Sequence, residues 1–300
     1  MNALPRIRVH ARNGAVVLQE GICLSFYMHR SHQEVGPSVL LALDVYLEAV
    51  GRDVLRWYPD MDGDWQELTA EAWTGQRTAL REGNAPRLQL TDRPDGVADH
   101  EFNYRGQDLG ALSEEDAART VCALSCWLPT AFLERQGPAR VQGLALELAT
   151  ILPFDSGHAG LAFHALSQLS GVRERLEQER ILYPGMDVPD EDASQYLGTR
   201  VRGIHWMNFL GPSVLGELGG AEALRARLTH PDTAVQPLGE DRAVVTLGDA
   251  PDAGDTSQGN VLPAYRELTR VLEPWLTSRE AARPYRENEA LRRWERRFLD

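Results

Sequence analysis

The chain has 300 residues, of which 43% are hydrophobic and 25% are charged, and these values are ordinary for a soluble globular protein. It carries 44 acidic and 31 basic side chains. The resulting net charge of −13 at pH 7 argues against a nucleic-acid-binding protein, which needs clustered positive charge. No apolar run approaches the roughly 18 residues that span a membrane, and the first residues lack the apolar segment of a signal peptide. We therefore expect a cytoplasmic protein that binds neither nucleic acid nor membranes.

Strands and helices alternate along the first half of the chain. Ile22–Met28 is rich in β-forming residues and predicts a strand, and apolar residues at helical spacing over Val39–Val50 predict the helix that follows. Val121–Leu128 predicts a buried strand. Val141–Ile151, which is entered through a Gly-Pro turn signal, predicts a second long helix.

The second half continues the alternation with less regular spacing. His158–His164 predicts a strand and Gly171–Leu182 a charged surface helix. Two further strands are predicted over Val201–Phe209 and Ala243–Leu247. Pro263–Leu276 predicts a final helix, because its large apolar residues gather on one face.

The character of the strands favours an α+β fold. Their residues mix polar and apolar types, whereas the strands of a doubly wound parallel sheet are near-continuous apolar runs. The connections vary in length, and the loops Arg93–Gln107 and Pro251–Asn260 are polar and expected to be exposed. We therefore predict a mixed or mainly antiparallel sheet with helices packed on it.

Composition suggests one domain followed by a tail. We expect a single α+β domain over residues 1–276 and an Arg-rich tail over residues 277–300. In the tail, Trp294 and Phe298 are four residues apart, so a short helix would dock both rings onto the domain.

An internal echo links two distant segments. Tyr58–Asp62 reads YPDMD and Tyr183–Asp187 reads YPGMD, and each follows a strand–helix unit and opens an acidic loop. A degenerate internal duplication is one interpretation, and chance in a short pattern is the other, because the flanking sequences match poorly.

No motif for catalysis or cofactor binding is present. The sequence contains neither a nucleophile elbow, a phosphate-binding loop nor a dinucleotide fingerprint, so we assign no catalytic residue and no cofactor. An acidic run that begins at Asp60 resembles a calcium loop, but Trp65 stands where that loop needs glycine. His158 and His164 would share one face of a regular strand. They lack Cys or carboxylate partners at ligand spacing, so we assign no metal site.

Two loops combine acidic and aromatic residues, as protein-binding surfaces often do. The first is Asp60–Asp64, with several Trp and Tyr residues around it, and the second is Asp187–Asp192, flanked by Tyr183 and Tyr196. The competing interpretation is that the rings belong to the core and the acids are merely solvated. The candidate contacts for a basic partner are Asp60, Asp62, Asp64, Trp65, Asp187, Asp190, Glu191 and Asp192.

A set of short segments spans nearly the whole chain in order. They are Glu34-Val35, Tyr46–Gly51, Trp127–Thr130, Gly157–Phe163, Tyr183–Asp187, Val201–Trp206, Leu218–Gly220 and Arg293–Phe298. Each is weak alone, but the ordered set resembles the TsiV-like family of bacterial immunity proteins. That family is associated with type VI secretion and protects against VRR-Nuc-type nuclease effectors.

The resemblance implies an antitoxin that binds a cognate secreted toxin and blocks its active site or substrate groove, with no catalysis of its own. The acidic charge favours a basic toxin, and we expect a monomer or weak homodimer. Two alternatives differ in what a structure would show. A cytoplasmic enzyme acting on a small molecule would have a deep pocket with convergent polar groups, and a non-catalytic scaffold would have a large apolar self-association patch.

Overall fold

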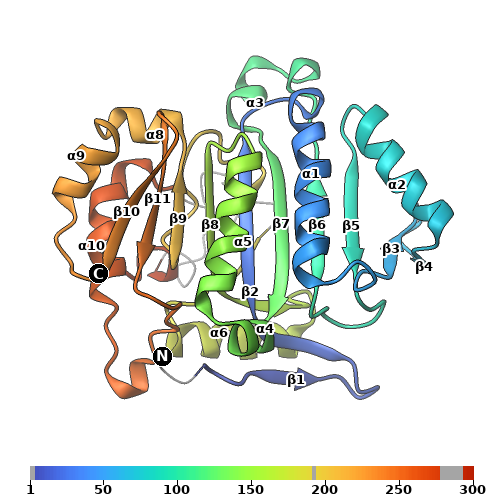
Figure 1. Ribbon diagram of the computed structural model, residues 1–300. Coiled ribbons are helices and arrows are strands. Elements are labelled where there is room, and N and C mark those ends of the chain that lie inside the picture. Colours follow the sequence, from blue (N-terminus) through green and yellow to red (C-terminus); the bar gives the residue numbers. More distant parts are fainter. Residues whose placement is uncertain (1–3, 191–193, 278–292) are drawn as a thin grey trace.

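The computed structural model describes residues 4–190, 194–277 and 293–300. Its central feature is an 11-stranded sheet in the order β10-β11-β9-β8-β2-β7-β6-β5-β3-β4, with β1 paired to β2 off this path (Figure 1). All the pairs of neighbouring strands are antiparallel. The predicted α+β class is therefore confirmed.

The strands are β1 (Arg8–His10), β2 (Val16–Met28), β3 (Trp57–Pro59), β4 (Trp65–Glu67), β5 (Arg87–Thr91), β6 (Glu101–Arg105), β7 (Cys122–Pro129), β8 (Ser156–Ala165), β9 (Met207–Leu210), β10 (Thr233–Leu238) and β11 (Arg242–Leu247). The α-helices are α1 (His32–Val50), α2 (Ala70–Glu82), α3 (Glu114–Arg119), α4 (Thr130–Gln136), α5 (Pro138–Ile151), α6 (Ser170–Leu182), α8 (Pro212–Glu217), α9 (Gly220–Arg227) and α10 (Pro263–Leu272). Short 3₁₀ turns occupy Leu109–Ala111, Thr256–Gln258 and Glu273–Trp275. No helix in these described ranges is long and apolar enough to cross a membrane.

One face of the sheet, which we call the front face, is covered by α1 and α5 (Figure 1). Side chains alternate between the faces of a strand, so Leu24 and Phe26 of β2 point toward these helices while Ser25 and Tyr27 point away. Tyr46 of α1 is fully buried, and its hydroxyl donates a hydrogen bond to the Trp127 carbonyl, 2.6 Å away. The front face therefore carries the larger apolar core.

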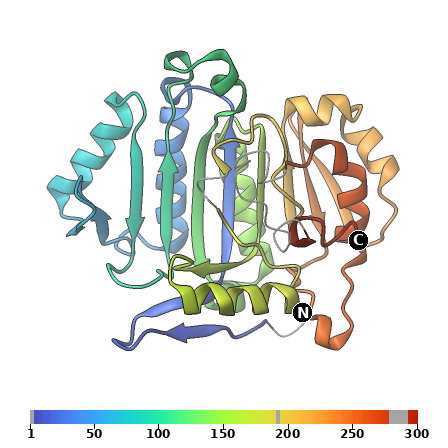
Figure 2. The same ribbon diagram turned by 180° about the vertical axis from the view of Figure 1, so that it is seen from behind.

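The opposite back face is covered unevenly. Helix α10 lies over the β9–β11 end of the sheet (Figure 2), where its Leu268 and Leu272 share an apolar cluster with Val245 of β11. The chain directly after α6 reaches the edge of β8, where Asp187 forms a parallel bridge with Ala162. This part of the edge is open to Asp187 because β9 pairs only with the first residues of β8.

Three expectations about the elements are wrong. Arg93–Gln107 is not an exposed loop, because it contains the buried strand β6 between β5 and β7. The strand expected over Val201–Phe209 is only Met207–Leu210, since Val201 instead bridges Leu276. Pro251–Asn260 is partly buried, and Ala253 accepts a 2.8 Å hydrogen bond from the Gly185 amide. Gly185 must be glycine, because a Cβ there would lie 2.1 Å from the Asp252 carbonyl oxygen.

The described part of the C-terminal tail lies against the body. Trp294 and Phe298 are buried, and Phe298 belongs to the α10 cluster. The Arg297 guanidinium donates a 2.6 Å hydrogen bond to the Pro184 carbonyl. Most of the arginines that define the tail lie outside the described residues, so the division at residue 277 stays a prediction. The proposed internal duplication also stays a prediction. Tyr58–Asp62 leads into the exposed β3–β4 hairpin, whereas Tyr183–Asp187 ends in a buried bridge to β8.

Candidate functional site

A row of polar side chains crosses the back face of the sheet. Strand register pairs Asn103 of β6 with Ser125 of β7, Ser125 with Ser25 of β2, Ser25 with His158 of β8, and His158 with Asn208 of β9. Most of these side chains are buried. A buried sheet face is normally apolar, because an unsatisfied polar group loses its hydrogen bonds to water. This row is therefore the first place in the fold to look for a functional site.

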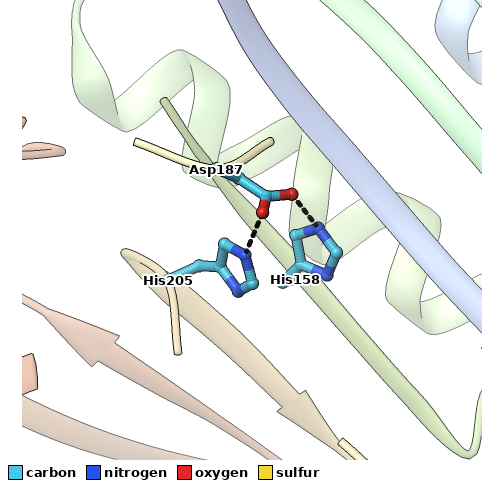
Figure 3. A group of neighbouring side chains, drawn as sticks. All are labelled: His158, Asp187 and His205. Atoms are coloured by element: carbon cyan, nitrogen blue, oxygen red, sulfur yellow. Dashed lines mark ion pairs between the residues drawn. The ribbon is translucent and has the colours of Figure 1, made fainter. Parts of the chain in front are cut away.

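At one end of the row lies a buried group that we call the Asp187 cluster, formed by His158, Asp187, Arg202 and His205. Each imidazole directs its Nε2 toward a different carboxylate oxygen of Asp187, at 3.7 Å for His158 and 3.6 Å for His205 (Figure 3). The two imidazole rings stack with their centroids 3.8 Å apart. Arg202 forms an ion pair with Asp187 and donates a 2.8 Å hydrogen bond to the Val188 carbonyl.

Backbone contacts fix the position of each member. The Asp187 amide donates to the Leu161 carbonyl, and the Asp187 carbonyl accepts from the Phe163 amide, both at 2.8 Å. His158 is held in the middle of β8. The Asn208 side chain makes two hydrogen bonds to the backbone of His205: its oxygen accepts from the His205 amide at 2.9 Å, and its nitrogen donates to the His205 carbonyl at 2.7 Å. The cluster is therefore rigidly positioned by the sheet.

Burial and charge fix the ionisation of the cluster. Burial alone would raise the pKa of Asp187, but the neighbouring Arg202 guanidinium is the main opposing influence and that pKa is held well below its usual range. Burial, aided by the neighbouring His205, lowers the pKa of His158 to about 3. Burial likewise lowers the pKa of His205. At neutral pH the cluster thus contains one carboxylate, one guanidinium and two neutral imidazoles.

Farther along the row, an open hollow of about 390 Å³ lies on the back face of β6 and β7. We call it the back-face cleft and define it by Trp65, Glu101, Trp127, His164, Val188 and Pro189. Trp65 follows the first predicted acidic loop, and Val188 and Pro189 belong to the second. The fold thus brings parts of two loops that are distant in sequence to opposite sides of one cleft.

The predicted contact residues of the first loop are partly structural. Asp60 is half-buried and shapes the β3–β4 turn, because its Oδ1 accepts from the amides of Asp62 and Asp64, both at 3.0 Å. The hydrogen bond from the Gln66 side chain, together with those from the two backbone amides, lowers the pKa of Asp60. Asp62 and Asp64 are exposed, and Trp65 is half-buried where it lines the cleft.

The second loop differs from its prediction. Asp187 is 2% exposed and paired with Arg202, so it is not the exposed acid that the sequence suggested. The reason is its bridge to β8, which draws the start of the loop into the sheet. Asp190 is half-buried and lines a smaller pocket beside Ser25 and Asn103. Glu191 and Asp192 lie outside the described residues.

The sequence did not identify the partners of Asp187. His158 was noted as a histidine without a carboxylate at ligand spacing, and the structure supplies both Asp187 and His205 from distant segments. One signal was available: Val201–Trp206 places Arg202 and His205 in a glycine-containing run that is too polar for an ordinary strand. As expected for a regular strand, β8 does place His158 and His164 on the same face.

Comparison with known proteins adds two findings. Residues 38–298 match the family described as TsiV, type VI immunity for VRR-NUC. Among solved structures, the fold is similar to that of the Pseudomonas aeruginosa T6SS protein PA0821, with a TM-score of 0.79 and 18% sequence identity. The alignment covers 99% of this chain and 88% of that protein, and at this identity it shows a shared fold alone. The comparison with curated proteins gave no significant match.

Proposed function

Because the chain belongs to the TsiV family of type VI immunity proteins, we propose that it binds one cognate type VI effector nuclease and neutralises it without catalysis. In this proposal the bound protein covers the active site or substrate groove of the effector. It acts in the cytoplasm, as a monomer or weak homodimer.

The observation that carries the proposal is the convergence of the two acidic–aromatic loops on the back-face cleft. Trp65 stands on one side of this cleft and Pro189 on the other, and Trp127 lies in its lining. Aromatic rings provide rigid contact area with little loss of conformational entropy, and hot spots of protein interfaces are rich in them. We infer that a segment of the effector inserts between these sides.

The charge around the cleft favours a basic partner. Asp62 and Asp64 are exposed at the tip of the β3–β4 hairpin, next to Trp65. Asp190 belongs to the loop on the other side, beside Pro189. A nuclease groove that binds phosphates carries clustered positive charge, so acidic side chains on both sides of a cleft complement it.

The first test is co-purification of this protein with the product of the neighbouring gene, together with protection of cells that express that product. We expect a stable complex and full protection. A neighbour that is neither toxic nor bound contradicts the proposal.

The second test locates the interface. Trp65→Ala should weaken effector binding about 30-fold or more, which corresponds to the roughly 2 kcal/mol lost at an interface hot spot. Trp275→Ala is the matched control, because Trp275 is another half-buried tryptophan, on the α10 side of the molecule. Equal affinities for both variants would place the interface away from the cleft while leaving the immunity function intact.

A further inference from the structure

We propose that His158, Asp187 and His205 form a binding site for a divalent transition-metal ion, with Zn²⁺ as the best match. One ligand atom from each residue lies within 4.8 Å of the other two, and all three residues are buried. His158 lies in β8, Asp187 lies in the chain that follows α6, and His205 lies just before β9 (Figure 3). This proposal is separate from effector binding and does not depend on it.

The first argument is that two buried nitrogens lack a hydrogen-bond partner. Nε2 of His158 and Nε2 of His205 are both inaccessible to solvent, and neither makes a hydrogen bond. Both lie near the Asp187 carboxylate, yet at 3.7 and 3.6 Å they are too far away to bond to it. Leaving such groups unsatisfied costs free energy, so a pair of them facing one carboxylate calls for a missing partner.

The second argument comes from the tautomer of His205. Its Nδ1 lies 3.2 Å from the Gly203 carbonyl oxygen, which can only accept a hydrogen bond. Nδ1 therefore carries the proton, and the lone pair of Nε2 points toward the negatively charged Asp187. A backbone carbonyl on the far nitrogen is also the usual way in which proteins orient a metal-binding histidine.

The third argument is distance. Zinc binds histidine nitrogen and carboxylate oxygen at about 2.0–2.2 Å, so neighbouring ligand atoms of a tetrahedral site lie roughly 3.3–3.5 Å apart. The observed separations of 3.7 and 3.6 Å run to different carboxylate oxygens, and the three ligand atoms lie within 4.8 Å of one another. Binding an ion therefore requires one oxygen of Asp187 to face both histidines and the stacked imidazole rings to turn and converge.

Arg202 decides which kind of ion fits. Its guanidinium pairs with Oδ2 of Asp187, whereas Oδ1 faces His205. In a loaded site Arg202 would orient the carboxylate from the outside, as residues around metal ligands commonly do. Its positive charge also weakens the attraction for any cation. Two imidazole ligands therefore favour Zn²⁺, Co²⁺ or Ni²⁺ over Mg²⁺ and Ca²⁺, which prefer oxygen.

A small cavity adjoins the site. It has a volume of about 40 Å³ and is lined by Asp187, Arg202 and His205 on one side and by Trp294 and Phe298 on the other. This space is large enough for a water molecule, which could complete the coordination as a fourth ligand. A bound ion would link the chain after α6, through Asp187, to β8 and to the start of β9. We therefore expect the ion to stabilise the fold.

The experiment uses untagged full-length protein that has been stripped with a chelator and titrated with Zn²⁺ or Co²⁺ alone. We expect one ion per chain, a rise in melting temperature, and for Co²⁺ the visible absorption of a tetrahedral complex. His205→Ala and His158→Asn should weaken Co²⁺ binding by about 100-fold or more. His164→Gln is the matched control, because His164 is a partly buried histidine on the same face of β8, and this variant should bind normally.

Two results would overturn the proposal. The first is the absence of one-to-one binding to the wild-type protein, a measurement that does not depend on how any variant folds. The second is wild-type affinity in folded His205→Ala and His158→Asn proteins, which would place the bound ion elsewhere.

Discussion

The back face of the sheet has two halves that differ in covering and in chemistry. Over β9–β11, Leu210, Val245 and Leu247 pack beneath α10 in an apolar cluster. Over β5–β7, the same face presents Gln89, Asn103 and Ser125, whereas α6 contacts β2 and β8 (Figure 2). One half is therefore packed as an apolar core, whereas the other is lined by polar side chains.

The Asp187 cluster lies between the two halves. His158 belongs to the polar row, whereas Arg202 and His205 line a cavity shared with Phe298 of the α10 cluster. Asp187 also begins the segment whose Val188 and Pro189 line the back-face cleft. The cluster thus connects the stable half of the back face with the wall of the cleft.

The largest effect is expected from breaking this connection. Asp187→Ala would leave the buried Arg202 without its carboxylate, and removing one partner of a buried ion pair typically costs about 3–5 kcal/mol. Chemical denaturation measures this loss in the free energy of unfolding. Asp62→Ala, at an exposed position, should change it by no more than about 0.5 kcal/mol. Similar values for the two variants would show that the cluster does not stabilise the fold.

The next effect tests the two halves directly. Leu268→Ala removes a fully buried side chain from α10 and should destabilise the protein by about 2–5 kcal/mol. Gln89→Ala, on the exposed polar half, should cost less than about 0.5 kcal/mol. Both are measured by the same denaturation experiment. A large cost at Gln89 would mean that the polar half supports the fold rather than a partner.

A pH effect is expected from the cleft. His164 stacks on Trp127 with the ring centroids 4.2 Å apart. Its Nδ1 lies 3.0 Å from the Ala98 carbonyl oxygen, and its Nε2 lies 3.5 Å from Glu101. Burial lowers the pKa of His164 from 6.5 to about 4, against the opposing effects of the hydrogen bond to the Ala98 carbonyl and of the Asp92 and Asp99 charges. Between these two values the unfolded chain binds a proton that the folded chain does not. Stability is therefore retained above pH 6.5 and lost as the pH falls toward about 4.

The loss assigned to His164 is at most about 3 kcal/mol, since one pKa unit corresponds to about 1.4 kcal/mol. Denaturation at a series of pH values should show His164→Gln losing less stability than the wild type on acidification. Parallel pH profiles for the two proteins would remove His164 as the cause.

The sequence predicted the parts of the fold that have strong local patterns. Apolar residues at helical spacing identified α1, α5 and α10, and apolar runs identified β2 and β7. Strand β6 was missed because Glu101 and Asn103 alternate with Phe102 and Tyr104. Such alternation is expected of a strand whose sheet has one polar face, but from the sequence it was interpreted as a polar loop.

The candidate site could be predicted only in part, for a different physical reason. The acidic–aromatic character of Asp60–Asp64 and Asp187–Asp192 is visible in composition, but their convergence depends on how β3 and β8 are placed in the sheet. Asp187 was expected to be exposed because an isolated carboxylate is costly to bury. Its partners Arg202 and His205 are distant in sequence, so only the fold shows that the cost is offset.

The smallest effect concerns the two exposed acidic hairpins at opposite edges of the sheet. Asp62 and Asp64 lie in the β3–β4 hairpin, and Glu240 and Asp241 lie in the β10–β11 hairpin. If charge on the cleft side steers a basic effector, association should slow on the order of tenfold at high salt, as the Debye length shortens from about 30 to about 3 Å. Replacing Asp62 and Asp64 with Asn should weaken this salt dependence. It is followed by measuring the association rate constant by stopped flow at a series of salt concentrations. Glu240→Gln with Asp241→Asn removes the same formal charge and should leave the dependence unchanged, because those acids lie at the far edge. If both double variants weaken the salt dependence equally, only the total charge of −13 matters. The difference between the two halves would then not affect how fast the effector associates.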